Sequence, residues 1–264
     1  MDDVLVTGGT GHLGQDVVRL LKARGDRVRI LARIPGQDPD VDWIQGDLST
    51  GAGVSEAVAG APTVVHAATL SPAARRGHLR LGDFFRSPPE VDIDGTRRLL
   101  DAATQAGVQH FLHVSIVGVQ QSRFPYSRLK ATAENLVRDS ALPCSIVPAT
   151  GFYWLLARML DTMARRRIWP LPSNLEMQPC DSADFAEYVV ECVAAGPGGD
   201  RPGFGGPETL TLVELARQYQ AARGIRRRIV GLRLPGFALR AGGPQTCPGG
   251  RHGKTAWAEW LVRH

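Results

Sequence analysis

The apolar residues in the first half of the chain fall into two alternating patterns. Short apolar runs predict strands at residues 3–8, 27–33, 41–47, 62–68, 110–119 and 143–149. Apolar residues spaced three or four apart predict helices over 14–25, 90–107 and 126–140. Strands that alternate with helices in this way are typical of βαβ units in a parallel sheet.

The second half of the chain is less regular. Amphipathic helices are expected over 152–167, 182–196 and 209–224, with Ser182 as the N-cap of the second helix and Gly196 as its end. Gly- and Pro-rich loops separate these helices. We therefore predict an α/β fold, in which residues 1–150 form a doubly wound parallel sheet that binds a dinucleotide. Residues 151–264 are expected to form a small mixed C-terminal cap that binds substrate.

Composition supports a globular protein. Of the 264 residues, 43% are hydrophobic and 22% are charged, which is ordinary for a globular domain. The first residues lack the features of a secretory signal and no apolar run is long enough to span a membrane, so we expect a cytoplasmic protein. The four cysteines have no CxxC spacing and no histidine cluster beside them, so no metal site is expected.

Arginine gives the chain much of its net charge of +5, especially in the runs 164–170 and 224–233. Such runs form either a solvated basic face or a site for a polyanion. No basic stripe interleaved with aromatic residues accompanies them, so we expect the solvated face. The expected partner is a small-molecule substrate, with no nucleic acid and no membrane, and the chain is expected to be a monomer or a homodimer.

The stretch VLVTGGTGHLG (residues 4–14) carries the first candidate site. It follows a predicted strand and opens a predicted helix, which is the context in which a Gly-rich loop binds phosphates. Gly8 would permit the sharp turn, Gly11 the approach of a pyrophosphate, and Gly14 the close packing of helix on strand. The helix N-terminus would supply free N–H groups to the phosphates. The alternative is a tight turn that binds nothing.

The ends of the following strands carry side chains suited to the adenosine part of a dinucleotide. Arg33 stands where an acidic residue would favour NAD, and a guanidinium there can pair with a 2′-phosphate. Arg33 therefore favours NADP(H), although a surface arginine at a strand end is the simpler interpretation. Asp47 can accept a hydrogen bond from the adenine amino group. The small residues Ala67 and Ala68 would let the fourth strand lie against the cofactor.

Tyr126 and Lys130 form the candidate catalytic pair. They are four residues apart on a predicted helix, so both side chains lie on one face. A phenol has a pKa of about 10, and a nearby ammonium lowers that pKa and favours proton exchange with a substrate oxygen. The alternative is a half-buried tyrosine beside a solvated lysine. Ser115, at the end of the fifth strand, is the candidate hydrogen-bond donor to the substrate oxygen.

With these residues in place, the chain resembles the short-chain dehydrogenase/reductase superfamily, and more closely its atypical NmrA-like branch of NAD(P)-binding Rossmann-fold proteins. The resemblance rests on TGGTGHLG, ILAR, GDL, VVHAA, DIDGTRRLLDAA, HVSIVGV, YSRLK and VPATGF, in the family's order. It implies that Tyr126 and Lys130 are the family's YxxxK pair. Many relatives have two consecutive hydroxyl residues at the fifth strand and use the second. Ile116 takes that place here, which leaves Ser115, Ser122 or a cofactor hydroxyl for the role.

The resemblance also implies the set of residues that bind the cofactor, NADP(H). These are Gly8, Thr10, Gly11, His12, Leu13, Arg33, Asp47, Leu48, Ala67, Ala68, Lys130, Pro148, Ala149 and Phe152. Pro148, Ala149 and Phe152 match the place where relatives line the nicotinamide, although Phe152 also fits a core position.

The segment 70–90 is longer than the corresponding linker in this branch, and long loops are often functional. We hypothesise that it forms a substrate lid in which Phe84 and Phe85 shape an apolar pocket. Tyr153 and Trp154 would supply the opposite wall, or else belong to the core. Deletion of 72–86 should raise KM or abolish turnover and leave NADPH affinity intact.

These features predict an NADP(H)-dependent oxidoreductase that reduces a ketone, aldehyde or activated alkene in a medium-sized apolar substrate. The Arg-, Gly- and Pro-rich composition is compatible with a GC-rich bacterial genome and a role in secondary metabolism. Two alternatives remain. One is an isomerase, dehydratase or cyclase of the same fold without net redox turnover. The other is a non-catalytic NADP(H) sensor of the NmrA type. Substrate identity and stereochemistry do not follow from the sequence.

Overall fold

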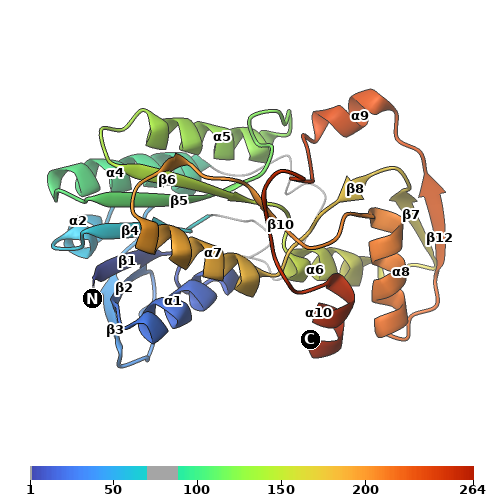
Figure 1. The fold of residues 1–264 in the computed structure, drawn as a ribbon, viewed down its shortest axis with the longest axis horizontal. Helices are drawn as coiled ribbons and strands as arrows, with labels where there is room; N and C mark the ends of the chain where they lie inside the picture. Colours follow the sequence, from blue (N-terminus) through green and yellow to red (C-terminus); the bar gives the residue numbers. More distant parts are fainter. Residues whose placement is uncertain (1, 70–88) are drawn as a thin grey trace.

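A computed structural model describes residues 2–69 and 89–264, and a parallel sheet forms its centre (Figure 1). The main strands are β1 (Asp3–Thr7), β2 (Arg27–Ala32), β3 (Val41–Gln45), β4 (Thr63–His66), β5 (His110–Ile116) and β6 (Cys144–Ala149). Their spatial order is β3-β2-β1-β4-β5-β6, and every pairing among them is parallel. The order reverses between β1 and β4, and ligands bind at such a switch point. The predicted doubly wound Rossmann fold is confirmed.

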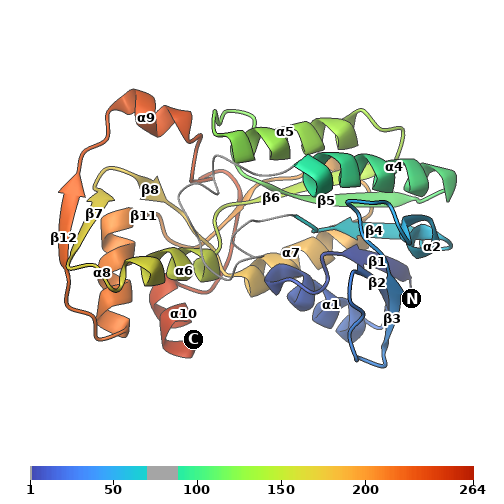
Figure 2. The ribbon, with the colours of Figure 1, turned by 180° about the vertical axis from the view of Figure 1, so that it is seen from behind.

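Helices cover both faces of this sheet (Figures 1 and 2). One face carries α1 (His12–Arg24) and α7 (Ser182–Ala195). The other carries α2 (Val54–Val58), the π-helix η2 (Glu90–Gly95), α4 (Thr96–Gln105) and α5 (Pro125–Arg138). Successive residues of β1 serve opposite faces, because Val4 and Val6 join the core beneath α1 and Leu5 joins the core beneath α4. The alternation of apolar residues thus builds two cores.

The ends of the helices follow local chemistry. Gly25 ends α1 in the left-handed conformation at φ +92°, where a side chain would be strained. Asp181 caps α7, because its carboxylate accepts from the N–H of Ala183. The prediction of Ser182 as this N-cap is wrong, since Ser182 is the first residue of the helix and Asp181 has the extended backbone of a cap. Gly196 ends α7 as predicted.

Residues after β6 contribute both to the sheet and to a cap. The short strands β9 (Gly199–Asp200), β10 (Phe204–Gly205) and β13 (Arg251–His252) extend the main sheet, and α7 packs on it. The cap surrounds a third core that includes Trp169, Tyr219 and Trp257. The remaining elements are α6 (Tyr153–Met163), β7 (Ile168–Pro172), β8 (Glu176–Met177), β11 (Leu210–Thr211), α8 (Leu212–Ala222), β12 (Arg228–Leu232), α9 (Gly236–Ala241) and α10 (Trp257–Arg263).

The two arginine runs lie side by side on the surface of the cap. Strands β7 and β12 pair in parallel with Ile168 opposite Arg228, which brings the preceding arginines at 165–167 and 226–228 to one end of the pair. All of these arginines are exposed, as expected for a solvated basic face. Among the described helices, none is both long enough and apolar enough to cross a membrane.

Candidate active site

The Gly-rich loop lies tightly against the end of β4. Gly8 has φ +78°, and a Cβ atom there would lie 2.7 Å from the backbone nitrogen of Ala68. A Cβ atom on Gly14 would clash with the carbonyl oxygen of Gly8, so α1 packs directly on the loop. The turn predicted for Gly8 and the close approach predicted for Gly14 are therefore present. Only glycine fits at these two positions.

The N-terminus of α1 is open to a ligand. Gly11 is its N-cap, with an extended backbone and no side chain that caps the helix, and its N–H donates to the carbonyl of Gly8 at 2.9 Å. The first N–H groups of a helix have no partner within the helix, and they attract anions. Thr10 and His12 are exposed beside them, while the Leu13 side chain packs against the core. This loop fits the phosphates of a dinucleotide.

Arg33 and Asp47 lie at the carboxyl ends of neighbouring strands. Arg33 is exposed just after β2, with no ion pair to a carboxylate of the described residues. Asp47 follows β3 and accepts from the N–H of Ser49 at 2.8 Å. Burial alone would raise the pKa of Asp47, but the Ser49 hydrogen bonds and the nearby Arg33 charge outweigh burial and lower it. The two side chains thus present opposite charges at the carboxyl ends of β2 and β3, where the adenosine was predicted to bind. Leu48, by contrast, is buried in the core beneath α4.

Lys130 is buried in an ion pair that the sequence analysis did not foresee. Its Nζ lies 2.7 Å from Oδ1 of Asp92 in η2, and the two side chains are 6% and 1% exposed. Thr69 donates to the same Oδ1 at 2.8 Å. Burial alone would lower the pKa of Lys130, but the Asp92 carboxylate outweighs burial and raises it. Lys130 is therefore a charged group held inside the protein, and the alternative of a solvated lysine is wrong.

Tyr126 lies in the first turn of α5, one turn before Lys130. It is half-buried, and its electrostatic interaction with Lys130 contributes to the raised pKa of that lysine. Pro125 occupies the first position of α5, where its missing N–H costs no hydrogen bond. The helix thus places a partly accessible phenol beside a permanent buried cation. This is the arrangement predicted for a proton-exchanging pair, and the catalytic role itself stays a prediction.

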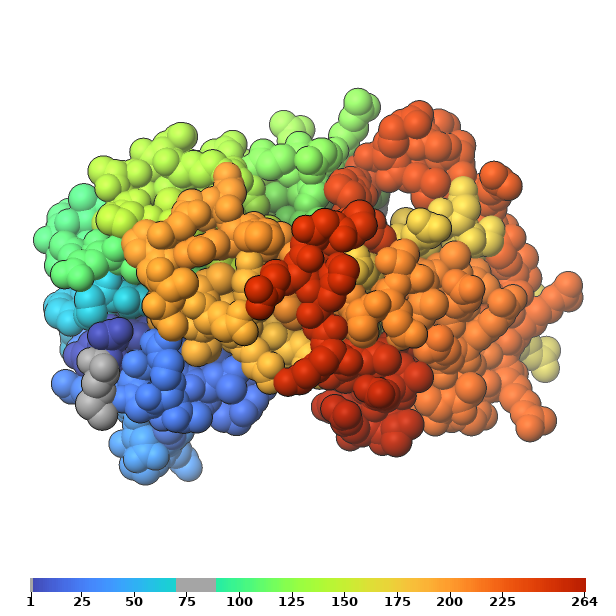
Figure 3. Space-filling view, in the orientation of Figure 1, coloured from blue at the N-terminus to red at the C-terminus, as the bar shows by residue number. Residues whose placement is uncertain are grey.

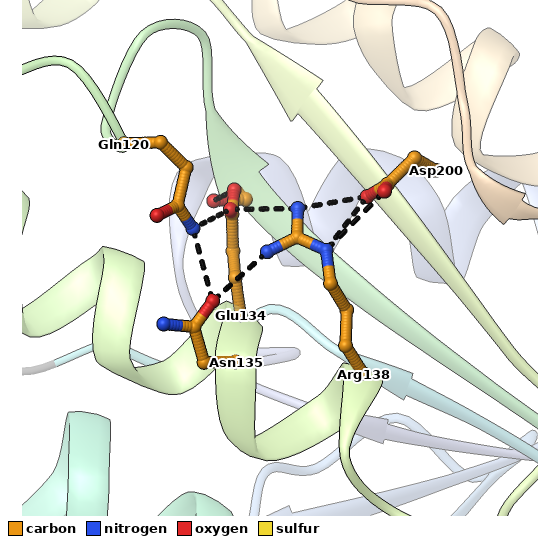
Figure 4. A network of polar contacts seen from close by, with 6 residues as sticks. Gln120, Glu134, Asn135, Arg138 and Asp200 are labelled. Atoms are coloured by element: carbon orange, nitrogen blue, oxygen red, sulfur yellow. Dashed lines mark hydrogen bonds and ion pairs between the residues drawn. The ribbon is translucent and has the colours of Figure 1, made fainter.

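Ser115 makes a hydrogen bond that directs its hydroxyl into the protein. Its Oγ donates to Oε1 of Glu134 on α5 at 2.6 Å, and Ser115 is 4% exposed. Figure 4 shows that Glu134 also accepts from Gln120 and from Arg138, which bridges to Asp200. This network ties β5 to α5 and to β9. The geometry favours a structural role for Ser115, whose catalytic role stays a prediction.

A second chain of buried polar groups runs beside the Asp92–Lys130 pair. Thr96 donates to the backbone carbonyl of Asp92 at 2.8 Å, so its oxygen accepts from Nε2 of His66 at 2.9 Å. The other nitrogen of His66 then accepts from Thr7 at 2.7 Å. Burial lowers the pKa of His66 to about 3, which keeps the ring neutral. The sequence analysis missed these residues, although Asp92 and Thr96 belong to the quoted stretch DIDGTRRLLDAA and His66 to VVHAA.

The residues predicted to line the nicotinamide or the substrate lie in different places. Phe152 packs on the sheet core and Trp154 borders the Gly-rich loop, whereas Tyr153 lies in the cap core. Phe152 is half-buried at the start of α6 and packs on the core near Pro148 and Ala149 of β6, while Trp154 stacks on His12 with ring centroids 4.5 Å apart. The indole N–H of Trp154 is buried and has no hydrogen-bond partner among the described residues. Trp154 therefore borders the Gly-rich loop.

Tyr153 is not part of a pocket wall. It is 1% exposed in the cap core, and its hydroxyl donates to the carbonyl of Thr255 at 3.0 Å. The prediction that it contacts substrate is wrong, because α6 turns this residue towards α10 and Trp154 towards the loop. Phe84, Phe85 and nearly all of the expected lid at 70–90 lie outside the described residues. Within the described ranges, no group of three or more His, Cys, Asp or Glu residues is placed to hold a metal ion.

Comparisons with known proteins identify the family of the chain. Residues 8–195 match a family of NAD(P)H-binding proteins. A 3-beta-hydroxysteroid dehydrogenase of Mycolicibacterium neoaurum is 27% identical, over 88% of this chain and 73% of its own length. A chloroplastic divinyl chlorophyllide a 8-vinyl-reductase of Oryza sativa subsp. indica is 30% identical over 72% of this chain, which spans only 51% of that protein.

Solved structures show the same architecture. The NADPH-dependent quinone oxidoreductase QOR2 of Escherichia coli, solved with NADPH, has a TM-score of 0.76 at 16% identity and covers 98% of this chain and 99% of its own. MoeE5, solved with UDP-glucuronic acid and NAD, has a TM-score of 0.73 at 20% identity and covers 98% of this chain and 96% of its own. These likenesses show that the chain shares their fold.

Proposed function

Because this chain belongs to the NAD(P)H-binding family and to the NmrA-like branch of the short-chain dehydrogenases/reductases, we propose that it is an NADP(H)-dependent oxidoreductase. It reduces a ketone, aldehyde or activated alkene in a medium-sized apolar substrate. The observation that carries the proposal is the Tyr126–Lys130 pair, a partly accessible phenol one helical turn from a buried, charged ammonium. The relatives that are dehydrogenases and reductases support the reaction class.

Each part of the site would have its own role in the reaction. The loop from Gly8 to Gly14 and the N-terminus of α1 would hold the diphosphate, and a bound nicotinamide would supply the hydride. Tyr126 would donate its phenolic proton to the substrate oxygen. Lys130 would stabilise the phenolate that remains, and Asp92 keeps that lysine charged and fixed in place.

The preference for NADP(H) rests on Arg33. Its guanidinium is exposed beyond the end of β2, with no described carboxylate paired to it, and can bind a 2′-phosphate at two points. The residues that directly follow it, Ile34 and Pro35, include no acidic side chain to accept from the ribose hydroxyls of NAD. Solved structures of this fold hold either NAD or NADPH, so the preference proposed here rests on the residues of this chain.

A second candidate is supported by Ser115. Because its hydroxyl donates to Glu134 and the next residue is Ile116, the end of β5 offers no unpaired hydroxyl to hold a carbonyl oxygen. This favours an isomerase, dehydratase or cyclase that keeps the cofactor without net hydride transfer. In that enzyme Tyr126 would still exchange a proton with the substrate.

One titration experiment tests the proposal. The purified protein is titrated with NADPH and NADH, and cofactor absorbance is then followed with a panel of bulky aromatic ketones, with Tyr126→Phe as the matched variant. We expect NADPH to bind more tightly than NADH and to be oxidised by at least one ketone. Tyr126→Phe should lose turnover by about 100-fold or more and keep its cofactor affinity unchanged. Product without net cofactor loss would support the second candidate. Binding without any product would support the sensor and overturn both.

A further inference from the structure

A cavity of about 700 Å³ lies between α9 and the loop that leads into α5. Its lining includes Gln121 and Arg123 from that loop and Phe237, Leu239, Arg240 and Pro244 from α9 and the segment after it. Figure 3 shows the molecule hollowed beside the orange-red segment that contains α9. A cavity of roughly 300–1,000 Å³ suits a small organic ligand.

The lining combines apolar walls with positive charge. Phe237 is 72% exposed at this site, although large aromatic side chains are usually covered, and no residue of α9 is buried. Arg123 and Arg240 are the charged residues of the lining, and no carboxylate of the described residues forms an ion pair with either. An apolar wall with two such guanidiniums complements an apolar molecule that carries an anionic group.

The loop that lines the cavity leads directly into the candidate catalytic helix α5. The N–H of Arg123 donates to the carbonyl of Ala241 at 2.8 Å, which fixes the loop to the end of α9. Gly243 packs against Gly118, where a Cβ atom would lie 2.7 Å from the Gly118 carbonyl oxygen. Tyr126 follows Arg123 by three residues, in the first turn of α5. Arg123 thus lies in the loop directly before the turn that carries the phenol, and Tyr126 itself is not one of the residues that line the cavity.

We propose that this cavity is the outer part of the substrate site, beyond Tyr126, and that it takes a bulky apolar molecule bearing a carboxylate or phosphate group, with Arg123 and Arg240 binding the anion and Phe237 covering the apolar part. The assignment as substrate site rests on the proposed oxidoreductase function, but the binding of an apolar anion does not. The expected lid at 70–90 and the wall at Tyr153 are not needed for this site.

Binding of naphthalene probes tests the proposal without any need for turnover. Calorimetry compares 2-naphthoate and 2-naphthyl phosphate with neutral 2-naphthol, and with acetate and inorganic phosphate, in the presence of NADPH. We expect the two naphthyl anions to bind at least about tenfold more tightly than 2-naphthol, and the small anions to bind weakly. Which of the two naphthyl anions binds more tightly distinguishes a carboxylate ligand from a phosphate ligand.

Matched variants locate the binding. Arg123→Gln and Arg240→Gln should each weaken 2-naphthoate by about tenfold and leave 2-naphthol unchanged. Arg128→Gln removes an exposed arginine of α5 that does not line the cavity, and should change neither. Phe237→Ser should weaken both naphthyl ligands, and all four variants remove exposed side chains, so they should fold normally.

Three outcomes would overturn the proposal. Equal affinity for 2-naphthoate and 2-naphthol would show that the arginines do not select an anion. Loss of affinity in Arg128→Gln as large as in Arg123→Gln would show nonspecific charge attraction. Arg-dependent binding that does not inhibit ketone reduction would separate the cavity from the substrate site. If Arg-dependent binding is found in a protein that turns over no ketone, the proposed oxidoreductase function fails and the anion site stands.

Discussion

Replacement of Asp92 by Asn measures how much the buried Asp92–Lys130 ion pair contributes to the free energy of unfolding. Asn keeps an oxygen that can accept from Thr69 and Lys130, so the change removes charge and little volume. Because the side chains of Asp92 and Lys130 are 1% and 6% exposed, Lys130 would be left as a buried cation with no ion pair to another carboxylate of the described residues. Breaking a buried pair in this way costs about 3–5 kcal/mol of stability. Because the hydrogen bonds to the side chain at position 92 are retained, we expect a loss of about 3 kcal/mol in the free energy of unfolding. For a chain of this size that corresponds to a fall in Tm of about 6–12 °C.

Thermal unfolding followed by circular dichroism checks this value, and the chain offers a matched control. Lys22 and Asp38 form an ion pair with the same N–O distance, 2.7 Å, but their side chains are 26% and 40% exposed. Asp38→Asn should therefore change Tm far less, because water already screens that pair. If Asp92→Asn and Asp38→Asn lower Tm equally, burial does not control the strength of these pairs and the reasoning is refuted.

The pH dependence of the same pair has a definite sign. The Asp92 carboxylate raises the pKa of Lys130 in the folded state above the ordinary lysine value of about 10.4. Its contribution to stability is therefore fully present below the unfolded pKa of about 10.4 and is lost as pH rises through the folded pKa. Without Asp92, burial lowers the pKa of Lys130, so the lysine of the variant loses its proton at a lower pH than the lysine of the wild type. The difference in unfolding free energy between the wild type and Asp92→Asn should therefore be largest near pH 7 and shrink as the pH rises above 10.5. A difference that widens above pH 10.5 would contradict the assigned cause.

Three further predictions concern the cofactor loop and its surroundings. Arg33→Ala should raise the Kd for NADPH by about tenfold or more and leave the Kd for NADH nearly unchanged, as measured by fluorescence titration, and equal effects would refute the 2′-phosphate contact. Gly8→Ala should abolish binding of both cofactors, because a Cβ atom would lie 2.7 Å from the nitrogen of Ala68 at φ +78°; retained affinity would show that the loop does not hold the phosphates. Ser115→Ala leaves Glu134 buried with one donor fewer, so we expect a loss of about 1–3 kcal/mol in urea unfolding with most turnover retained. A loss of turnover above about 100-fold with intact stability would instead make Ser115 catalytic.

The parts of the fold that sequence could predict are those decided by neighbouring residues. Alternation along β1 sends Val4 and Leu5 to opposite faces, and the apolar stripe of α1 faces one of those cores. Gly8 and Gly14 signal a loop that passes close to backbone, and the structure shows that approach. The N-cap of α7 is Asp181 and not the predicted Ser182, because both residue types are good N-caps and only the backbone shows which one precedes the helix.

The parts of the site that sequence could not predict depend on pairs far apart in the chain. Lys130 meets Asp92 only because η2 and α5 pack side by side, and nothing within four residues of Lys130 signals that its counter-ion is Asp92. The place of Ser115 at a strand end predicts a hydroxyl that faces the substrate, yet the direction of that hydroxyl is set by Glu134 on the next helix. The cavity beside α9 likewise depends on Arg123 and Arg240 lining one space, and the hydrogen bond from the N–H of Arg123 to the carbonyl of Ala241 holds the loop against α9. Local pattern thus identifies the residues able to do chemistry. The packing of α5 against η2, and of the loop before α5 against the end of α9, determines which charges those residues face.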